Sequence, residues 1–238
     1  MPSSSVIRSG ANLSPREIEP PRGDTVHIWR GSLNANEREL TRLTSVLDSS
    51  ELQRAARFRF PLHRSRFIVG RGRLRLILAQ YLQCGPADIE FEYSAYGKPH
   101  LKNHLLHFNL AHTEDRFILA ICESPVGVDL ELRRTIPDLD SLATQVFSSA
   151  ELALWKTTRT LAAFLSLWTR KEALLKAIGL GIANHVKDVS VFFENDAEIK
   201  VPGALTPEHW TVRMVSTDEE IWSMAVPIQN PQTFTFKI

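Results

Sequence analysis

The sequence predicts an α+β fold made of two similar halves, each a small antiparallel sheet packed with helices. The main observation is an order of elements that occurs twice: strand, helices and strands precede Ser124 and follow it again. The chain has 238 residues, which suits one large domain or two small halves. Its 43% hydrophobic and 23% charged residues are ordinary for a globular protein with a sizeable core. A cleft between the halves would be the natural ligand site.

The first half contains alternating apolar segments that predict strands and apolar repeats with helical spacing that predict helices. Strands are predicted within 25–33, 89–101, 106–112 and 116–124, and helices within 34–58 and 63–83. One of residues 48–50 could cap a new turn in the first helical segment. Gly70 and Gly72 would each weaken the long helix by roughly 1 kcal/mol relative to alanine, so a close packing partner is expected there. Gly85 is the predicted C-cap of that helix.

The second half repeats this order of elements. Strands are predicted at 123–134, 186–195, 209–216, 220–228 and 234–238, the last four being of antiparallel type, and helices at 136–156 and 161–179. Ser148 and Glu151, three residues apart, form a capping-box pattern inside the first of these helices. The segment 161–179 has the clearest helical spacing, and Gly179 is expected to close it.

The N-terminal segment and the cysteines indicate the class of protein. The first 24 residues are polar and rich in proline and serine, so a disordered tail is expected. They contain no apolar run of about seven residues, which argues against a secretory signal, and no run of about 18 predicts a membrane span. Two cysteines without CxxC spacing favour a reduced, cytoplasmic setting. The predicted units are a tail at 1–24 and halves at 25–124 and 125–238.

Arginines are concentrated in one segment of a chain whose formal net charge is only +1. Eight of them lie from Arg54 to Arg75, with no acidic residue between them. This pattern favours a local anionic partner over general polyanion binding. Nucleic acid is a rival partner, because a basic helix can contact phosphates. The nearly neutral net charge and the apolar residues of the same helix argue against that rival.

Three carboxylates stand where a plain core would have apolar residues. In the segment VGVDLE, Asp129 and Glu131 would point to one face of a strand, about 7 Å apart. Glu172 and Lys176 lie one turn apart on a helix, and strand and helix together could bring the three acids round one hard cation such as Mg²⁺. The cation would relieve their repulsion. Each motif alone also has an ordinary explanation, as a solvated strand face or an exposed ion pair.

Cationic side chains from other segments would complete this site. Lys98 follows Gly97 in the turn YGKP, and His112 ends the strand segment FNLAH. Taken singly, such residues are more often part of a loop, of the packing or of the surface. Together with Lys176, the arginines and a metal site, they would supply the positive charges that phosphoryl transfer requires.

The order of these motifs resembles the Sfp-type 4′-phosphopantetheinyl transferase family. The motifs are GKP, FNLAH, VGVDLE, FSSAE and WTRKEALLK followed by GLG, and they span roughly residues 48–191. Trp168 and the KEA triplet at 171–173 are similar to the branch that carries Trp and KEA instead of Phe and KES. The resemblance implies a pseudo-dimer of two α+β halves with coenzyme A in the cleft. It further implies Mg²⁺-dependent transfer of the phosphopantetheine arm of coenzyme A to a serine of an acyl or peptidyl carrier protein, with release of adenosine 3′,5′-bisphosphate.

The resemblance also implies roles for individual residues. Asp129, Glu131 and Glu172 would hold Mg²⁺, with Mn²⁺ as the alternative ion. Lys176 would contact the pyrophosphate, and Glu172 is the candidate base for the carrier serine. The coenzyme A site would be formed by Arg54, Arg64, Arg71, Lys98, Pro99, His112 and Lys176. The first half would therefore hold adenine and the 3′-phosphate, and the second half the metal and the chemistry.

Two departures from the family pattern affect this expected site. Ala111 stands where the family often has serine, which removes one hydroxyl contact, and Glu51 stands where a lysine can occur. Arg64, Arg66 or Arg71 could compensate, and the sequence does not rank them.

The expected partners leave several alternatives open. The segment 147–155 is a candidate docking surface for the carrier, with packing on its own half as the alternative. A relative that only binds coenzyme A and a Mg²⁺-dependent phosphohydrolase are the rival activities. A monomer without nucleic-acid or membrane partners is expected, because both halves lie in one chain. Fatty acid, polyketide and nonribosomal peptide synthesis remain equal candidates for the pathway.

Overall fold

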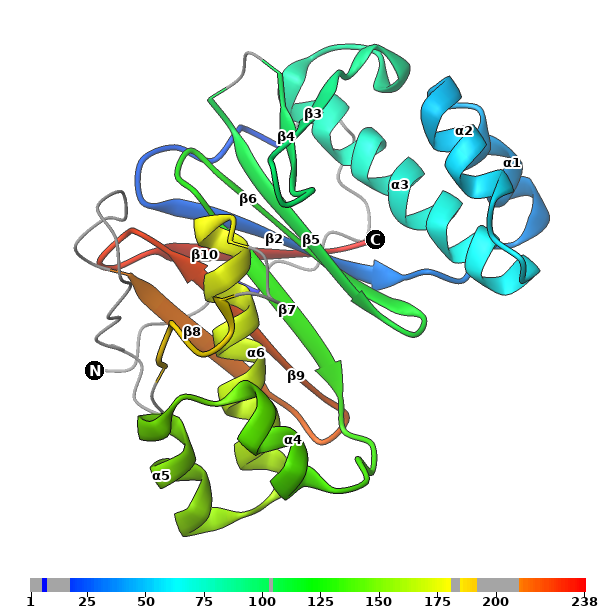
Figure 1. Ribbon diagram of the computed structural model, residues 1–238. Coiled ribbons are helices and arrows are strands. Elements are labelled where there is room, and N and C mark those ends of the chain that lie inside the picture. The colour runs from blue at the N-terminus through cyan, green and yellow to red at the C-terminus, as the bar shows by residue number, and fades with distance from the viewer. Residues whose placement is uncertain (1–5, 8–17, 103–104, 181–184, 192–209) are drawn as a thin grey trace.

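The computed structural model describes residues 6–7, 18–102, 105–180, 185–191 and 210–238, and it confirms the predicted α+β fold (Figure 1). The helices are α1 (Glu37–Thr44), α2 (Ser49–Ala56), α3 (Pro61–Leu82), the short 3₁₀ helix η1 (Pro86–Asp88), α4 (Leu139–Val146), α5 (Ser149–Thr158) and α6 (Leu161–Ile178). The strands are β1 (Val6–Ile7), β2 (Thr25–Ser32), β3 (Phe91–Tyr93), β4 (Pro99–Leu101), β5 (His107–Thr113), β6 (Arg116–Cys122), β7 (Gly127–Leu132), β8 (Thr211–Ser216), β9 (Glu220–Val226) and β10 (Gln232–Lys237).

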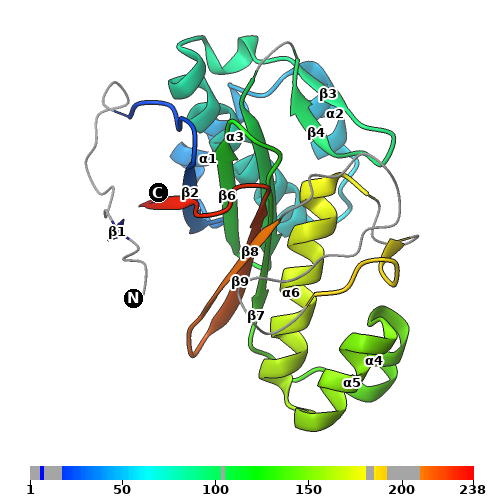
Figure 2. The same ribbon diagram turned by 90° about the vertical axis from the view of Figure 1, so that its left-hand side faces the viewer.

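The larger sheet has five strands in the order β1-β10-β2-β6-β5. Helix α3 lies across one face of it, with α1 and α2 beside α3, and β3 pairs with β4 in a separate hairpin (Figures 1 and 2). Strands β2, β6 and β5 are antiparallel neighbours, but β10 runs parallel to β2. The prediction of an antiparallel strand at 234–238 is therefore wrong, because the chain returns after β9 and adds this strand to the sheet of the first half.

The smaller sheet consists of β7, β9 and β8, all antiparallel, and α6 lies along it (Figure 1). Helices α4 and α5 pack near the N-terminal part of α6. Aromatic side chains pack together there: the ring of Phe164 on α6 contacts the rings of both Phe147 and Trp155. All three rings are buried, so this helical corner belongs to the core of the second half.

The two sheets face each other through a shared apolar core. It includes Ile28 of β2, Ile118 of β6 and Val128 of β7, together with residues of β9. The amide oxygen of Asn109 on β5 accepts a hydrogen bond of 2.9 Å from the backbone N–H of Val128. Because side chains alternate along a strand, the residues next to Val128 on β7 point to the opposite side, toward α6. The sheet packing thus fixes which face of β7 carries acids.

Two predicted helical segments are each divided into two helices. The segment 34–58 forms α1 and α2, because the side chain of Asp48 accepts a hydrogen bond from the N–H of Glu51 and begins a new helix. The segment 136–156 forms α4 and α5, and the predicted capping box of Ser148 and Glu151 begins α5. Local capping chemistry was readable from the sequence, but the breaks between the helices were not.

The glycines singled out in the sequence, one inside a helix and two at predicted helix ends, differ in outcome. A Cβ added at Gly72 would lie 2.8 Å from Cβ of Leu43, which confirms that another helix, α1, packs closely there. Gly179, with φ of 84°, closes α6 as expected. Gly85 is not the cap of α3, and that prediction is wrong. The helix ends at Leu82, and Gln83 itself adopts the left-handed conformation with φ of 51°.

Some sequence predictions fall partly or wholly beyond the described residues. Most of the expected tail at 1–24 lies outside them. Of the expected strand at 186–195, residues 186–191 are described and form no strand, and the remainder lies outside. Within the described part of the chain, no helix is both long and apolar enough to cross a membrane.

Candidate active site

The backbone of β7 lies directly against α6 where β7 begins. A Cβ added at Gly127 would overlap with the carbonyl oxygen of Ala173 and the backbone nitrogen of Ala177. Only glycine permits this approach of strand and helix. The close contact brings the acids of β7 and those of α6 to one place.

Asp129, Glu172 and Lys176 form a contiguous ionic cluster at this junction. The Nζ atom of Lys176 lies 2.6 Å from Oδ1 of Asp129 and 2.9 Å from Oε2 of Glu172. Asp129 is 4% exposed, and its second oxygen, Oδ2, is buried without a hydrogen-bond partner among the described residues. A buried carboxylate oxygen without a partner is costly.

The pKa values show how strongly the three acids interact. Burial raises the pKa of Asp129 to about 8; Lys176 opposes this shift, and the charges of Glu172 and Glu131 add to it. Burial and then the charge of Glu172 raise the pKa of Glu131, against a hydrogen bond from Trp168. Burial works against the charged form of Lys176, but Asp129 and Glu172 hold its pKa above the usual value. Two carboxylates therefore share the ammonium of Lys176, and the charge of Glu131 is opposed by both Arg134 and Lys176.

These residues fit a divalent cation, on the grounds of the unpartnered Oδ2 of Asp129 and of the excess of negative charge. As the side chains lie, the described residues contain no group of three acids, histidines or cysteines arranged as a complete metal site. The ammonium of Lys176 lies between two of the acids instead. Asp129, Glu131 and Glu172 supply oxygen ligands of the kind that Mg²⁺ prefers. Their assignment as metal ligands stays a prediction.

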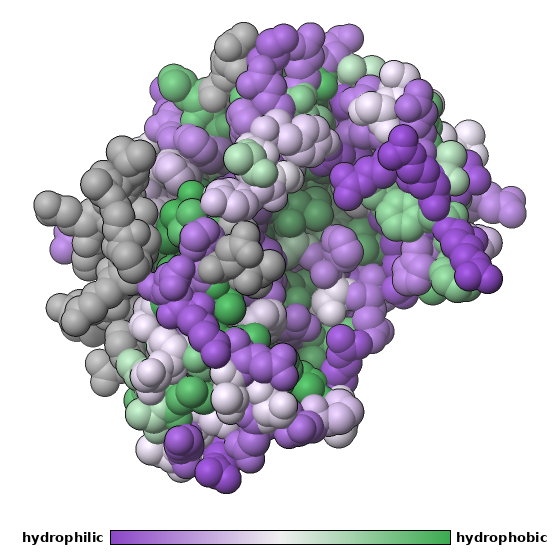
Figure 3. Space-filling model, viewed as in Figure 1, coloured by the Kyte–Doolittle hydropathy of each residue, from purple (hydrophilic) through white to green (hydrophobic). Residues whose placement is uncertain are grey.

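A cavity of about 560 Å³ lies between α3, the β3–β4 hairpin and β5. It is of the size usual for small-molecule sites. The surface in Figure 3 is hollowed between the upper and lower parts of the molecule, with apolar residues on the floor of the hollow. Of the predicted coenzyme A residues, Arg54, Arg71, Pro99 and His112 line the cavity. Arg64, Lys98 and Lys176 do not.

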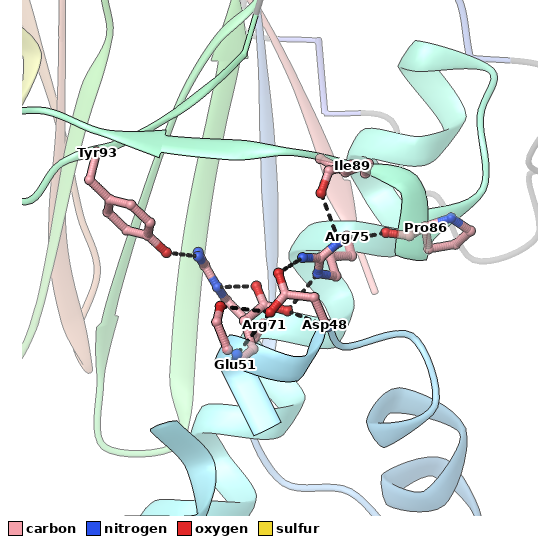
Figure 4. Close-up of polar contacts among 8 residues, drawn as sticks. Asp48, Glu51, Arg71, Arg75, Pro86, Ile89 and Tyr93 are labelled. Carbon is pink, nitrogen blue, oxygen red and sulfur yellow. Dashed lines mark hydrogen bonds and ion pairs between the residues drawn. The ribbon is translucent and has the colours of Figure 1, made fainter. Parts of the chain in front are cut away.

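The arginine-rich segment is divided between scaffold and cavity. The Nε atom of Arg71 forms an ion pair with Glu51 at 2.7 Å, and its Nη2 donates to the hydroxyl of Tyr93 at 2.6 Å (Figure 4). Arg75 is fully buried and pairs with Glu51 and Asp48. The N–H groups of Arg75 also donate to the carbonyls of Pro86 and Ile89 (Figure 4). The acids that neutralise these arginines come from α2 and its cap, so the interpretation of the whole arginine run as an anion site is too broad.

Arg66 is the arginine whose surroundings best suit an anion. It lines the cavity, and its Nε atom is buried without a hydrogen-bond partner among the described residues. Burial lowers the pKa of His112, and the charges of Lys176 and Arg66 lower it further. His112 therefore lies within electrostatic reach of both the cavity arginine and the acidic cluster. The sequence named Arg66 among three candidates but could not select it.

Aromatic and amide residues of the cavity wall were not predicted from the sequence. They are Phe58, His63, Phe67, Tyr93 and Asn109. Phe67 packs against Phe58, with ring centroids 5.3 Å apart, and the guanidinium of Arg54 lies 5.4 Å from the Phe67 ring centroid. Only Asn109 lies in one of the quoted motifs, FNLAH, and the others come together only when α3, the hairpin and the sheet pack.

The side chain of Lys98 extends toward the second half and not into solvent. Its Nζ donates to the carbonyl oxygens of Val126 at 3.1 Å and Ala177 at 3.3 Å. Burial lowers the pKa of Lys98 to about 8, against a smaller opposing effect of Cys122. A phosphate-binding role for Lys98 stays a prediction, with its ammonium committed to two carbonyls here.

The candidate docking segment 147–155 buries three of its nine side chains in its own half. Phe147 and Trp155 are buried, and Glu151 is fully buried in an ion pair with Lys171 of the KEA triplet. These contacts favour the alternative, in which the segment packs on its own half. They also give Lys171 a structural partner on α5.

Comparison with known proteins agrees with this geometry. A family described as the 4′-phosphopantetheinyl transferase superfamily matches residues 125–226, and one described as 4′-phosphopantetheinyl transferase, N-terminal, matches residues 31–124. The 4′-phosphopantetheinyl transferase HetI of Nostoc sp. strain PCC 7120 is 42% identical over 168 residues, which cover 67% of this chain and 71% of the relative. The chain belongs to the 4′-phosphopantetheinyl transferase superfamily.

More distant members support the same assignment. The 4′-phosphopantetheinyl transferase ffp of Bacillus subtilis is 29% identical over 77% of this chain and 82% of its own length. The 4′-phosphopantetheinyl transferase Sfp of Bacillus subtilis strain 168 is 28% identical over 70% and 75%, respectively. The family predicted from the motifs is confirmed, and the protein is an enzyme with phosphopantetheinyl transferase activity.

Proposed function

We propose that this phosphopantetheinyl transferase takes the arm from coenzyme A and attaches it to a serine of an apo acyl or peptidyl carrier protein. The reaction would depend on Mg²⁺ and release adenosine 3′,5′-bisphosphate. The observation that carries this proposal is the ionic cluster of Asp129, Glu172 and Lys176, with Glu131 beside it. This cluster has more carboxylates than cations and is electrostatically coupled to His112 in the cavity.

The cavity would hold the adenosine end of coenzyme A. Arg66 has a buried N–H group without a partner, and Arg54 lies beside the aromatic wall, so both suit the 3′-phosphate. Apolar and aromatic side chains such as Phe67 would contact the base. Arg71 is already paired with Glu51 and would contribute mainly by shaping the wall.

The acidic cluster would act on the pyrophosphate. Asp129, Glu131 and Glu172 would hold Mg²⁺, which when bound supplies positive charge to the phosphate oxygens. Lys176, held in place by its two carboxylate partners, would stabilise charge on the departing phosphate. His112 would contribute a further hydrogen bond at the boundary between cavity and cluster.

Glu172 would accept the proton of the carrier serine. The serine oxygen then forms a bond to the β-phosphorus of coenzyme A, and the bond from that phosphorus to the bridging oxygen breaks. The electron pair leaves with adenosine 3′,5′-bisphosphate. General base assistance of this kind is typically worth about 10²- to 10⁴-fold in rate.

Further properties follow from the same proposal. Both parts of the site lie in one chain, which supports a monomeric enzyme. Cys84 and Cys122 are free thiols, which supports a cytoplasmic location. Neither nucleic acid nor a membrane is needed as a partner.

Intact mass spectrometry tests the proposal. The enzyme would be incubated with coenzyme A, Mg²⁺ and apo carrier proteins from fatty acid, polyketide and nonribosomal peptide synthesis. We expect one or more carriers to gain the mass of phosphopantetheine, which would also identify the pathway. Hydrolysis of coenzyme A without any gain in carrier mass would instead indicate a phosphohydrolase, and unchanged coenzyme A would indicate a protein that only binds it.

A further inference from the structure

Lys98 joins the wall of the cavity to the acidic cluster. Its neighbours in the chain, Gly97 and Pro99, both line the cavity. Its side chain runs the other way, and Nζ donates to the carbonyls of Val126 and Ala177 in the second half. The backbone of Lys98 therefore lies at the cavity between α3, the hairpin and β5, and its charge lies at the junction of β7 and α6.

The turn that carries Lys98 is held firmly. The N–H of Gly97 donates to the carbonyl of Ser94 at 2.8 Å, and the N–H of Ser94 donates to the carbonyl of Lys98 at 2.9 Å. Gly97 has φ of 79°, a conformation that favours glycine. The ring of Tyr96, in the same turn, contacts His185 beyond α6 with centroids 6.0 Å apart. Movement of Lys98 relative to the turn is thereby restricted.

The two acceptors of Lys98 belong to the two elements that carry the acids. Val126 immediately precedes β7, three residues before Asp129. Ala177 lies in the last turn of α6, next to Lys176. Carbonyls in the last turn of a helix have no partner within the helix, and a cation is favourable there. Because Gly127 presses β7 against α6 at the same level, Lys98 bonds to both elements at their closest approach.

We propose that Lys98 is a positioning residue, which sets the distance between a nucleotide in the cavity and the carboxylates of β7 and α6. The inference rests on the proposed function for its effect on transfer, but the contacts themselves do not. In this proposal, the side chain of Lys98 bonds to the second half and does not make the phosphate contact that the resemblance implies. Misplacement of reacting groups by about 1 Å can lower a rate by about 10²-fold.

A variant without the charge of Lys98 can distinguish a positioning role from a purely stabilising one. Burial disfavours its charged form, so the ammonium is retained at a cost. The titratable groups that face it are the thiol of Cys122 on β6 and the imidazole of His107 on β5. Methionine would fill similar space without this desolvation cost. This gain offsets the loss of the donor to two carbonyls, so we expect Lys98→Met to fold with at most a small loss of thermal stability.

The test compares Lys98→Met with Lys102→Met, which removes a surface lysine that pairs with Glu90 near the same hairpin. We expect Lys98→Met to lower kcat for carrier modification by about 10²-fold, with calorimetric affinity for coenzyme A close to that of the wild type. Lys98→Arg should recover part of kcat, and Lys102→Met should match the wild type. A large loss of affinity for coenzyme A with kcat retained would show a phosphate ligand and overturn the proposal, as would unchanged kcat.

Hydrogen exchange keeps the inference testable if no carrier is modified. Lys98→Met should accelerate amide exchange in the segments 126–131 and 174–179, whereas Lys102→Met should not. Equal protection in Lys98→Met and the wild type would refute the bond between the halves. Failure of the wild-type enzyme to modify any carrier would instead count against the proposed function alone.

Discussion

Two of the ionic clusters among the described residues can be compared, one in each half. In the first half, Glu51 and Asp48 face Arg71 and Arg75, so two carboxylates meet two guanidinium groups. In the second half, the carboxylates of Asp129 and Glu172 share the ammonium of Lys176, and Glu131 lies within reach of their charges. The first cluster is balanced by its own residues and the second is not.

The difference distinguishes a structural cluster from the candidate metal site. Balanced buried charges hold elements together: here α2, its cap, α3 and the β3 strand are tied by Glu51, Arg75 and Tyr93 (Figure 4). An excess of buried carboxylate is unfavourable without a further cation. Asp129, whose pKa is raised to about 8, is the clearest sign of that excess. The substitutions below should therefore affect stability in one cluster and chemistry in the other.

The largest expected effect is that of Asp129→Asn on transfer. The substitution keeps the size of the side chain and an oxygen for Lys176 but removes the negative charge. We expect carrier modification to fall below detection and activation by Mg²⁺ to disappear. The thermal midpoint should not fall, because a costly buried carboxylate is removed. Normal activation by titrated Mg²⁺ would show that Asp129 is not a metal ligand.

Glu51→Ala, in the balanced cluster, should instead lower the stability of the fold. It leaves the guanidinium of Arg75, which is fully buried, without its Glu51 partner. Removal of one partner of a buried ion pair typically lowers the free energy of unfolding by about 3–5 kcal/mol. Urea unfolding would measure the loss, with Glu90→Ala in an exposed pair as the matched control. If both variants unfolded at the wild-type urea concentration, the first cluster would not be a structural one.

Glu172→Gln should slow the transfer reaction without loss of coenzyme A binding. As the candidate base, Glu172 would accept the serine proton, which the amide of glutamine cannot do. We expect turnover to fall by at least about 10²-fold, while calorimetry still detects coenzyme A. Transfer at the wild-type rate by this variant would remove Glu172 from the role of base.

A smaller effect is expected when two arginines of α3 are compared. Arg66→Met removes a buried N–H group in the cavity, whereas Arg64→Met alters an exposed side chain outside it. A charge-assisted hydrogen bond is worth about 1.5–3 kcal/mol, so Arg66→Met should weaken coenzyme A binding by about 10-fold or more. Arg64→Met should bind as the wild type does. Equal losses in both variants would show that the buried N–H group of Arg66 does not make it the preferred arginine for coenzyme A.

Much of the second half's site was predictable because it depends on short-range periodicity. Alternation along β7 places Asp129 and Glu131 on one face, and helical spacing places Glu172 one turn from Lys176. The chain order of the motifs then indicated the family. Only the packing at Gly127 was needed to bring strand and helix together, and glycine at that position gave no distinctive signal.

The first half's site was less predictable because its charges depend on tertiary partners. The sequence shows arginines without nearby acids, but the fold brings Glu39 to Arg73 and Glu51 to Arg71 and Arg75. The acceptors of Lys98 are backbone carbonyls, which any sequence provides. Likewise, nothing local in 234–238 shows that β10 would pair with β2 in parallel.

Titration of Mn²⁺, followed by electron paramagnetic resonance in the presence of coenzyme A, tests most directly whether the unbalanced acids hold a divalent cation. The wild-type enzyme should remove free Mn²⁺ signal until one ion is bound per chain, and excess Mg²⁺ should restore the signal. Asp129→Asn should leave the free signal unchanged, although coenzyme A still binds. Equal uptake of Mn²⁺ by the variant and the wild type would contradict the assignment of this cluster.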